Sequence, residues 1–497
     1  MNPALRYTDP STSPHAALGP GEAPDPALAD AALLAAIEAH RRTELPRLRR
    51  LWNYYRNPMT PTRDARGYRL GQESGLPARI LAGAAWGGVS RGVVVENDIG
   101  WRVQTMVDFL LGKPVRIVST APQEDRRALL DQVLDLVWER SGGIALLQDM
   151  ALLGQVYGHV DLVLRVDHDA VRLARGEPRA RALRAAEGLR IEVVDPCRGV
   201  PVFANAPISS ASLAPDAYAI LAPAPAEARA GLAADGRYAP AAGPDVAEVL
   251  TADARRVYEG GRLVWEREWS WSGERPPVVH IQNISDPTSY SGLGEVEPLI
   301  PLQDELNTRL CDRAHRVTMQ SFRMYLAKGV DGFDKAPIAP GQVWMTDNPE
   351  ASITAFGGDA PTPGEEAHIR ELREALDKAS GVPPLAGGVV QGRIGNLSSA
   401  NALRVTLMGV LAKTARKRVT YGAGMARMCA LVLEALDAGG ALATGADERG
   451  VRLSWPDPLP EDTQELVQIA KGKRELGVPA ERVLEELGYA PTDEGVA

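Results

Sequence analysis

Residues 294–322 read GEVEPLIPLQDELNTRLCDRAHRVTMQSF, and residues 397–436 read LSSANALRVTLMGVLAKTARKRVTYGAGMARMCALVLEAL. The apolar positions of the first stretch recur at intervals of three and four, with a polar interruption at Gln303: Leu299, Leu306, Leu310, Ala314 and Val317. This period predicts an amphipathic helix, and the second stretch predicts a longer one. We expect the two helices and the segment between them to surround something.

The segment between the two long helices has three parts. Residues 324–362 alternate short apolar runs with Pro and Gly turns, an excursion too long for a simple connection. Residues 365–381, EEAHIRELREALDKASG, predict a shorter helix, and residues 382–396, VPPLAGGVVQGRIGN, predict a glycine-rich loop.

Composition limits the class of protein. The 497 residues are 45% hydrophobic and 24% charged, which is ordinary for a folded chain with two or three cores. The three cysteines, Cys197, Cys311 and Cys429, have no CxxC spacing and are expected to be reduced.

The N-terminus has no signal-peptide pattern and no run of eighteen apolar residues occurs, so we expect an intracellular protein without a membrane partner. The net charge of −9 argues against tight binding to DNA through phosphates.

The N-terminal half alternates helical and strand patterns, which predicts an α+β fold. Residues 1–28 are rich in Pro, Ala and Ser and are expected to be a disordered arm. We expect helices over 26–52, broken by Pro46, over 98–111, capped by Asn97 or Asp98, and over 125–142 and 144–158. We expect strands at 115–118, 159–169, 189–196, 217–224, 246–271 and 276–283.

Catalytic and metal-binding motifs are missing from the sequence. The seven histidines show no HExxH or paired spacing; His159 and His168 flank one strand and are better explained as a polar pair than as metal ligands. The glycine-rich loop lacks GK[ST] and follows a helix, whereas phosphate-binding loops follow a strand. We therefore expect no enzyme activity, no metal and no cofactor.

The long helix is unusually basic. Between residues 397 and 437 there are six Lys and Arg side chains against two acids, and five are candidates for a basic belt that faces phosphate: Arg404, Lys413, Arg416, Lys417 and Arg418. A helical wheel places Arg404 away from the pair formed by Lys413 and Lys417, so they do not form one stripe. A solvated helix face remains the alternative.

Five phrases, in order along the chain, resemble the SPP1-type branch of the tailed-bacteriophage portal proteins: LPRLRRLWNYYRN (45–57), NDIGWRVQTMVDFLLGKPVRI (97–117), GLGEVEPLIPLQDELNTRLCDRAHRV (292–317), NLSSANALRVTLMGVLAKTARKR (396–418) and VPAERVLEELGY (478–489). The resemblance covers about residues 38–490. The sequence departs from the family pattern in the Ala- and Pro-rich region 205–248 and in GKPVRIVSTAP, which lacks nearby aromatic residues.

The resemblance implies a portal fold, in which an α/β wing, a two-helix stem, a clip, a tunnel loop and a helical crown build one subunit of a ring. After the arm (1–28), the implied domains are the wing at 29–293, stem helix 1 at 294–323, the clip at 324–362, stem helix 2 at 363–380, the tunnel loop at 381–397, the long wing helix at 398–439 and the crown at 440–497.

The resemblance also implies function, partners and location. A ring of about twelve copies at one capsid vertex would be the channel through which double-stranded DNA is packaged and ejected, touched weakly and without sequence specificity. Implied partners are the terminase large subunit, head–tail connector or adaptor proteins, and the major capsid and scaffold proteins. The implied location is the virion, with the host cytoplasm during assembly.

Two segments become candidate sites by this resemblance. The tunnel loop that would line the channel contains Gly387, Gly388, Val389, Val390, Gln391, Gly392, Arg393, Ile394 and Gly395. The clip candidates for terminase docking are Asp331, Phe333, Lys335 and Trp344.

Three other functions compete with this interpretation. Another structural head–tail connector or minor capsid protein would share much of the sequence character. A nucleotide-using enzyme built on the 387–395 loop would need the missing GK[ST]. A metabolic α+β enzyme would need a cluster of His, Asp or Glu that the sequence does not show.

Overall fold

The computed structural model describes the following parts of the chain: residues 26–62, 67–81, 92–203, 215–222, 246–259, 262–269, 271–321, 324–329, 347–356, 363–388, 404–459, 463–480 and 482–483. The chain forms two compact units. Unit 1 comprises Met1–Leu51, Arg102–Glu295 and Gly381–Ala497, and unit 2 comprises Trp52–Trp101 and Val296–Ser380.

Unit 1 is built from two antiparallel sheets and the helices that cover them. One sheet has the strand order β11-β4-β5, and the other has the order β10-β9-β8-β7-β6. The strands are β4 (His159–Val166), β5 (Leu189–Val194), β6 (Gly199–Val202), β7 (Ala217–Leu221), β8 (Val246–Leu250), β9 (Ala254–Glu259), β10 (Arg262–Glu268) and β11 (Val278–Gln282). The helices are α1 (Pro26–Ala39), α5 (Glu124–Arg140), α6 (Gly143–Tyr157), α7 (His168–Leu173), α8 (Pro178–Ala186), α13 (Met408–Ala438) and α14 (Thr463–Glu475).

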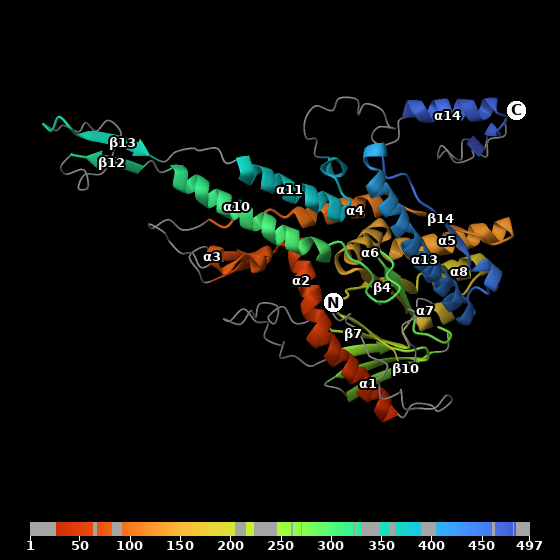
Figure 1. The fold of residues 1–497 in the computed structure, drawn as a ribbon. Coiled ribbons are helices and arrows are strands. Elements are labelled where there is room, and N and C mark those ends of the chain that lie inside the picture. Colours follow the sequence, from red (N-terminus) through yellow and green to blue (C-terminus); the bar gives the residue numbers. More distant parts are fainter. Residues whose placement is uncertain are drawn as a thin grey trace. The chain divides into compact units, whose positions relative to one another are not determined.

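Strand β4 shows how the layers of unit 1 are stacked. Its residues alternate between the two faces of the sheet. Val160, Leu162 and Leu164 join the core formed with α5, α6 and α13, whereas Val163 packs with Tyr218 and Leu250 of the second sheet. The far face of that second sheet packs against α1 through a separate apolar cluster (Figure 1). Because both faces of β4 are covered, the first six residues of this strand are buried.

Helix α13 is the central element of the unit 1 core. Thirteen of its residues are buried, among them Tyr421, Met425 and Cys429. A Cβ atom at Gly424 would come within 2.3 Å of Ile281 on β11, so only glycine allows this helix to lie so close to the sheet. By length and composition α13 also has the character of a membrane span, but 56% of its most apolar window is buried inside the protein. A core helix passes the same test, and this packing accounts for its apolar side chains.

A third pairing in unit 1 joins distant parts of the chain. Strand β3 (Arg116–Ser119) pairs antiparallel with β14 (Val451–Ser454), with Arg116 opposite Ser454 and Ser119 opposite Val451. Arg126 of α5 reinforces the connection through Glu448, at 2.7 Å between Nε and Oε1. The start of the segment expected to be a helical crown is thus tied into the sheet and helix framework of unit 1.

Unit 2 is organised around two helices, α10 (Ile300–Ser321) and α11 (Pro363–Ser380), which pack against each other (Figure 1). Its other elements are short: β1 (Met59–Pro61), β2 (Tyr68–Leu70), α3 (Ala78–Leu81), β12 (Met324–Lys328) and β13 (Ser352–Phe356). Strands β1 and β2 pair with each other, and so do β12 and β13. Helix α2 (Leu45–Arg56) and helix α4 (Asp98–Leu111) each contain a boundary between the units.

Buried amides hold unit 2 together. Gln72 donates through Nε2 to Tyr54 O and to Asn97 Oδ1, both at 2.7 Å, and its Oε1 accepts from Asn307 Nδ2 at 3.0 Å. Gln303 donates to Glu96 O at 2.6 Å. The polar interruption in the apolar stripe of α10 is therefore a fully buried and hydrogen-bonded side chain.

Most expected elements are present, with some physical differences. As expected, Leu306 and Leu310 of α10 are buried, and so is Leu299 just before the helix. Val317, near the other end of α10, is 50% exposed. The helix expected over 26–52 is broken by a π turn at His40–Glu44, in which Leu45 N bonds to His40 O. The wider turn lies just before Pro46, whose ring would clash with a carbonyl of a continuous α-helix. Asn97 caps α4, since its Oδ1 accepts from Gly100 N at 3.0 Å.

A buried polar cluster joins the two sheets of unit 1. Asp161 of β4 accepts from Tyr218 OH of β7 at 2.7 Å and from Tyr290 OH at 2.8 Å, and it pairs with His280 Nδ1 at 2.7 Å. The ring of His159 lies 5.5 Å from that of His280 and is almost completely buried. Burial lowers the pKa of His159 to about 3, against the opposing effect of Asp161. Burial also acts to raise the pKa of Asp161, but His280 outweighs it and holds this pKa below its ordinary value.

These shifts predict that acid destabilises the protein. A histidine with a depressed folded pKa contributes stability above its unfolded pKa of 6.5, and this contribution is lost as the pH falls toward 3. Between pH 7 and pH 5, His159 alone should lower the free energy of unfolding by about 2 kcal/mol. Urea unfolding at the two pH values measures the difference, which His159→Gln should reduce by that amount. His368→Gln, at a half-exposed position, is the control and should leave the difference unchanged. An equal pH dependence in His159→Gln and the wild type would contradict the assignment.

Candidate functional site

The glycine-rich loop begins at an anchored point in unit 1. Arg102 is almost fully buried on α4 and donates through Nη1 to Val382 O at 2.7 Å. A 3-10 turn, η5 (Pro384–Gly387), follows, and Gly388 ends it with a φ of 78°, a left-handed conformation that favours glycine. Of the nine loop candidates, Gly387 and Gly388 are placed in this way. The other seven, Val389, Val390, Gln391, Gly392, Arg393, Ile394 and Gly395, lie outside the described residues, and their role stays a prediction.

The expected clip contains a short antiparallel hairpin. Strand β12 pairs with β13 in a register that places Met324 opposite Phe356 and Lys328 opposite Ser352. The four docking candidates, Asp331, Phe333, Lys335 and Trp344, lie outside the described residues between these strands. The strand-and-turn character expected for 324–362 is present at both ends of that segment.

The basic-belt candidates differ from one another in their surroundings. Lys417 is 0% exposed and lies 2.7 Å from Glu295, measured from Nζ to Oε1. It also donates to Gln155 Oε1 of α6. Lys413, one turn earlier on α13, contacts the other oxygen of Glu295 at 2.5 Å. The two lysines therefore share one buried carboxylate, and Lys417 does not lie on the surface of the protomer.

Burial and charge act in opposite directions on this ion pair. Burial lowers the pKa of Lys417 to about 8, although Glu295 acts to raise it. Burial acts to raise the pKa of Glu295, but Lys417 and Lys413 outweigh it and hold that pKa below its ordinary value. Glu295 is further fixed through its backbone, since its N–H donates to Gln155 O at 2.7 Å. Sequence reasoning missed both partners, because an acid beside a glycine and a glutamine in an apolar helix give no periodic signal.

Two more belt candidates contact the segment that follows β14. Arg404 Nη2 lies 2.6 Å from Asp457 Oδ2. Arg418 donates to Pro456 O at 2.8 Å, and its guanidinium lies over the ring of Trp455 at 5.3 Å. Arg416 is exposed, and within the described parts of the chain it has no ion pair. Four of the five candidates therefore have contacts within the protein, and a phosphate-facing role stays a prediction.

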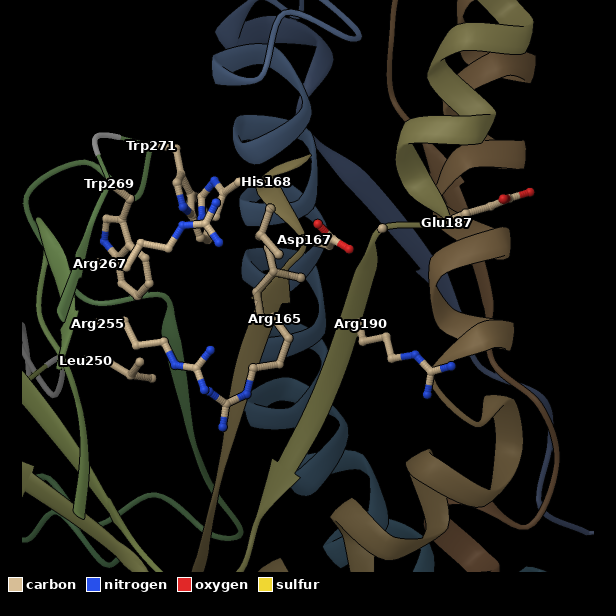
Figure 2. Close-up of a pocket in the computed structure, with 13 residues that line it drawn as sticks. Arg165, Asp167, His168, Glu187, Arg190, Leu250, Arg255, Arg267, Trp269 and Trp271 are labelled. Carbon is tan, nitrogen blue, oxygen red and sulfur yellow. The ribbon is translucent and has the colours of Figure 1, made fainter. Parts of the chain in front are cut away.

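One pocket lies between the two sheets of unit 1 (Figure 2). It has a volume of about 520 Å³ and is lined by arginines, with Trp269, Trp271 and His168 at one end. Figure 2 shows Arg165 and Arg255 pointing toward each other and Arg190 and Glu187 pointing away. Glu248 lies 2.5 Å from both Arg165 and Arg255, and Glu192 lies 2.7 Å from Arg165. The arrangement is an ion-pair network that ties β4 and β5 to β8 and β9.

The described residues give little support for metal binding or for histidine chemistry. They contain no group of three or more His, Cys, Asp or Glu side chains that could hold a metal ion. His159, which the sequence placed beside His168 at the ends of one strand, instead neighbours His280 and Tyr290, and His168 neighbours Trp269 and Trp271. The pair formed by His280 and Asp161 is closed off from solvent by its surroundings.

The buried ion pair gives a testable expectation. Glu295→Gln should lower the free energy of unfolding by about 3–5 kcal/mol, because it leaves Lys417 buried without a countercharge. The double variant Glu295→Gln/Lys417→Met should lose less, because the fully buried cation is then also removed. Arg416→Met, on the exposed side of the same helix, should change stability by about 0.5 kcal/mol or less. Urea unfolding of the wild type, Glu295→Gln, Lys417→Met and the double variant gives the coupling energy. Additive effects of the two single changes would contradict the pairing.

A comparison with protein-family models finds a match in the C-terminal part of this chain. Residues 270–488 match the family model described as "Phage portal protein, SPP1 Gp6-like". This range contains β11, α10, the β12–β13 hairpin, α11, α13, β14 and α14. No curated protein matches the chain.

Solved structures give a weaker similarity. The chain is similar to a protein in "Virion of native gene transfer agent (GTA) particle", with 15% identity, a TM-score of 0.42 and coverage of 79% of this chain and 90% of that chain. It is similar to a protein in "Neck of empty GTA particle computed with C6 symmetry", with 17% identity, a TM-score of 0.43 and coverage of 80% and 91%. It is also similar to a protein in "Neck of native GTA particle computed with C12 symmetry", with 15% identity, a TM-score of 0.43 and coverage of 79% of this chain and 90% of that chain. Scores at this level do not by themselves say what the chain does.

The family match is independent of these scores and falls on three of the five phrases quoted from the sequence. It begins before α10, includes both long helices and ends within VPAERVLEELGY. Residues 270–488 therefore match the SPP1-type portal family, which is the resemblance that the sequence predicted.

Proposed function

We propose that this chain is the subunit of a ring-shaped portal at one vertex of a capsid, through which double-stranded DNA is packaged and later ejected. The observation that carries the proposal is the match of residues 270–488 to the portal family. The order of elements in that range supports it: a long helix, a small hairpin, a second helix, a loop and a 31-residue helix. In this proposal α10 and α11 form the stem, residues 324–362 the clip, and residues 381–397 the tunnel loop.

The charge of the chain supports a channel that lets DNA slide. A ring of about twelve copies at −9 each would carry on the order of a hundred negative charges, which would repel phosphates and discourage adhesion. The internal contacts of Lys413, Lys417, Arg404 and Arg418 point in the same direction, because cations with internal partners are less available to a DNA backbone.

The partners in this proposal follow from the portal role. The clip would dock the terminase large subunit during packaging and head–tail connector proteins afterwards. The major capsid and scaffold proteins would surround the ring in the particle, and the host cytoplasm would be the place of assembly. The ring would also contact double-stranded DNA, weakly and without sequence specificity.

A nucleotide-using enzyme remains the less favoured function. The described flank of the glycine-rich loop is α11 followed by the η5 turn, whereas loops that hold nucleotide phosphates follow a strand and open a helix. Another head–tail connector or minor capsid protein remains the structural alternative.

Electron microscopy distinguishes these proposals. The purified chain should form rings with a central channel without any other phage protein, and rotational averaging should show about twelve copies. Rings are expected because each subunit of a portal contacts two neighbours through surfaces that close on themselves. Monomers at every protein concentration would contradict the portal function, and hydrolysis of ATP by the isolated chain would favour the enzyme.

The tunnel loop can be tested separately from ring formation. Removing residues 387–395 should leave the ring intact, because the described core of unit 1 does not include this loop beyond Gly388. The same deletion should impair DNA packaging, measured as DNA protected from nuclease inside particles. A deletion of equal length in the N-terminal arm, residues 5–13, is the control. Normal packaging by the loop deletion would show that the loop does not act on DNA.

A further inference from the structure

Helix α13 has an exposed apolar side opposite its buried one. Five residues, including one just before the helix, define what we call the α13 seam: Val405, Met408, Ala412, Ala415 and Val419. Their spacing is three, four, three and four, which is the spacing of residues that meet a neighbouring helix. All five are exposed, and Val405, Met408 and Val419 are exposed by 72%, 67% and 72%.

The seam is too ordered to be scattered surface residues. Single exposed apolar side chains are normal, but a continuous row on one side of a helix marks an interaction surface. The row extends about 21 Å along the helix axis. Its centre is formed by Ala412 and Ala415, whose small side chains let another helix approach closely. The opposite side of α13 is already packed in the unit 1 core, so the helix has two contact faces.

Helix α5 offers a surface of opposite character with the same spacing. Its exposed side contains Asp125, Ala128, Gln132, Asp135 and Glu139. Burial raises the pKa of Asp135, and the nearby charges of Asp131 and Glu139 raise it further, against the opposing effect of Arg116. Acidic charge is therefore in excess on this side of α5. We call it the α5 acidic face.

Arg416 borders the α13 seam with positive charge. It lies next to Ala415, is exposed and has no ion pair within the described residues. Arg427 lies beyond the end of the seam and pairs with Glu434 at 3.0 Å. A helix with acidic residues beside its small central positions would therefore fit the seam in both shape and charge. On the α5 acidic face, Ala128 supplies a small position and Asp125, Asp135 and Glu139 supply the acids. Gln132 lies between them and accepts from Arg179 Nη2 at 2.7 Å.

We propose that the α13 seam of one copy of this chain docks on the α5 acidic face of the next copy. This inference rests on the proposed ring and names the surfaces that build it. Two different faces of one protomer meet in a head-to-tail contact, which is the kind that closes into a ring. A symmetric pairing of two α13 seams would bring Arg416 near its own copy, and it would stop at a dimer. Both faces are exposed in the same protomer, so each is open to a neighbour.

Charge reversal tests this contact in the full-length chain. Val419→Glu places an acid against the α5 acidic face and should raise the protein concentration needed for half assembly more than ten-fold, measured by mass photometry and electron microscopy. Adding Asp135→Lys or Glu139→Lys to that variant should restore rings. Val264→Glu, which changes an equally exposed apolar residue on β10, is the matched control and should assemble like the wild type. Thermal unfolding of the monomer verifies that Val419→Glu folds normally, as its exposure leads us to expect.

The outcomes separate this inference from the proposed function. Wild-type rings together with unchanged rings of Val419→Glu would overturn the seam and leave the portal function standing. Unchanged rings with a loss of DNA packaging would assign the seam to the channel and likewise overturn its role between copies. Loss of rings that no charge reversal on α5 restores would overturn the α5 acidic face as its partner. A wild type that never forms rings would instead contradict the proposed function.

A cysteine pair gives a second and independent readout. Oxidation of the double variant Ala415→Cys/Gln132→Cys should produce a ladder of covalent multimers, because each copy would be linked to two neighbours. Each single variant should give no covalent species beyond those of the wild type, whose Cys311 and Cys429 are buried and Cys197 partly buried. A covalent dimer from Ala415→Cys alone would show that seam meets seam and would overturn the head-to-tail contact.

Discussion

The contact of Glu295 with Lys413 and Lys417 is the constraint on which the central part of this chain depends. Glu295 is the last residue of unit 1 before the chain continues into α10, and the two lysines lie in the first turns of α13. The carboxylate therefore holds the first part of α13 to the end of the segment that precedes α10 along the chain. Because the site is buried, neither the acid nor Lys417 can leave it without exposing the other to an environment of low polarity.

This constraint also explains why the rest of α13 can be so apolar. Once its start is held by the ion pair, the helix is free to bury Tyr421, Met425 and Cys429 against the sheet that contains β4 and β11. The close approach at Gly424 is part of the same packing. The exposed side of the helix is then held in a fixed orientation, so an ordered row of apolar residues on that side has a meaning that it would lack on a mobile segment.

Local sequence signals predicted the long elements of the fold and few of its contacts. Helix α10, strand β4 and the Asn97 cap follow from signals between neighbours along the chain, and all three are present in the structure. Burial along β4 does not alternate, because both faces of its sheet are covered. The pairing of β3 with β14 depends on residues more than 300 positions apart, which no local pattern reveals. Helices α7 and α8 are too short for periodicity, although Asp167 caps one and Pro178 begins the other.

In the candidate site, too, local sequence signals predicted the composition of an element but not the contacts of its side chains. Counting charges identified α13 as basic, but whether a cation faces solvent or a buried acid is decided by residues of other elements, such as Glu295, Gln155 and Asp457. Gln303 in α10 is a second example, since a polar residue in an apolar stripe can be exposed or can anchor a buried network. The sequence shows that such a residue is unusual, and its surroundings decide what it does.

The distribution of charge on α13 unites these observations. Lys413, Lys417, Arg404 and Arg418 have contacts inside unit 1, so the cation that the helix presents outward without such a contact is Arg416. Among the described residues of α13, an exposed cation without an internal contact is a weak attractor for a phosphate backbone in a body of net charge −9, because screening limits its reach to about 10 Å at ordinary salt. The same cation beside an apolar row is well suited to a short-range contact with an acidic helix. The charge pattern of α13 therefore favours contact with protein over contact with DNA.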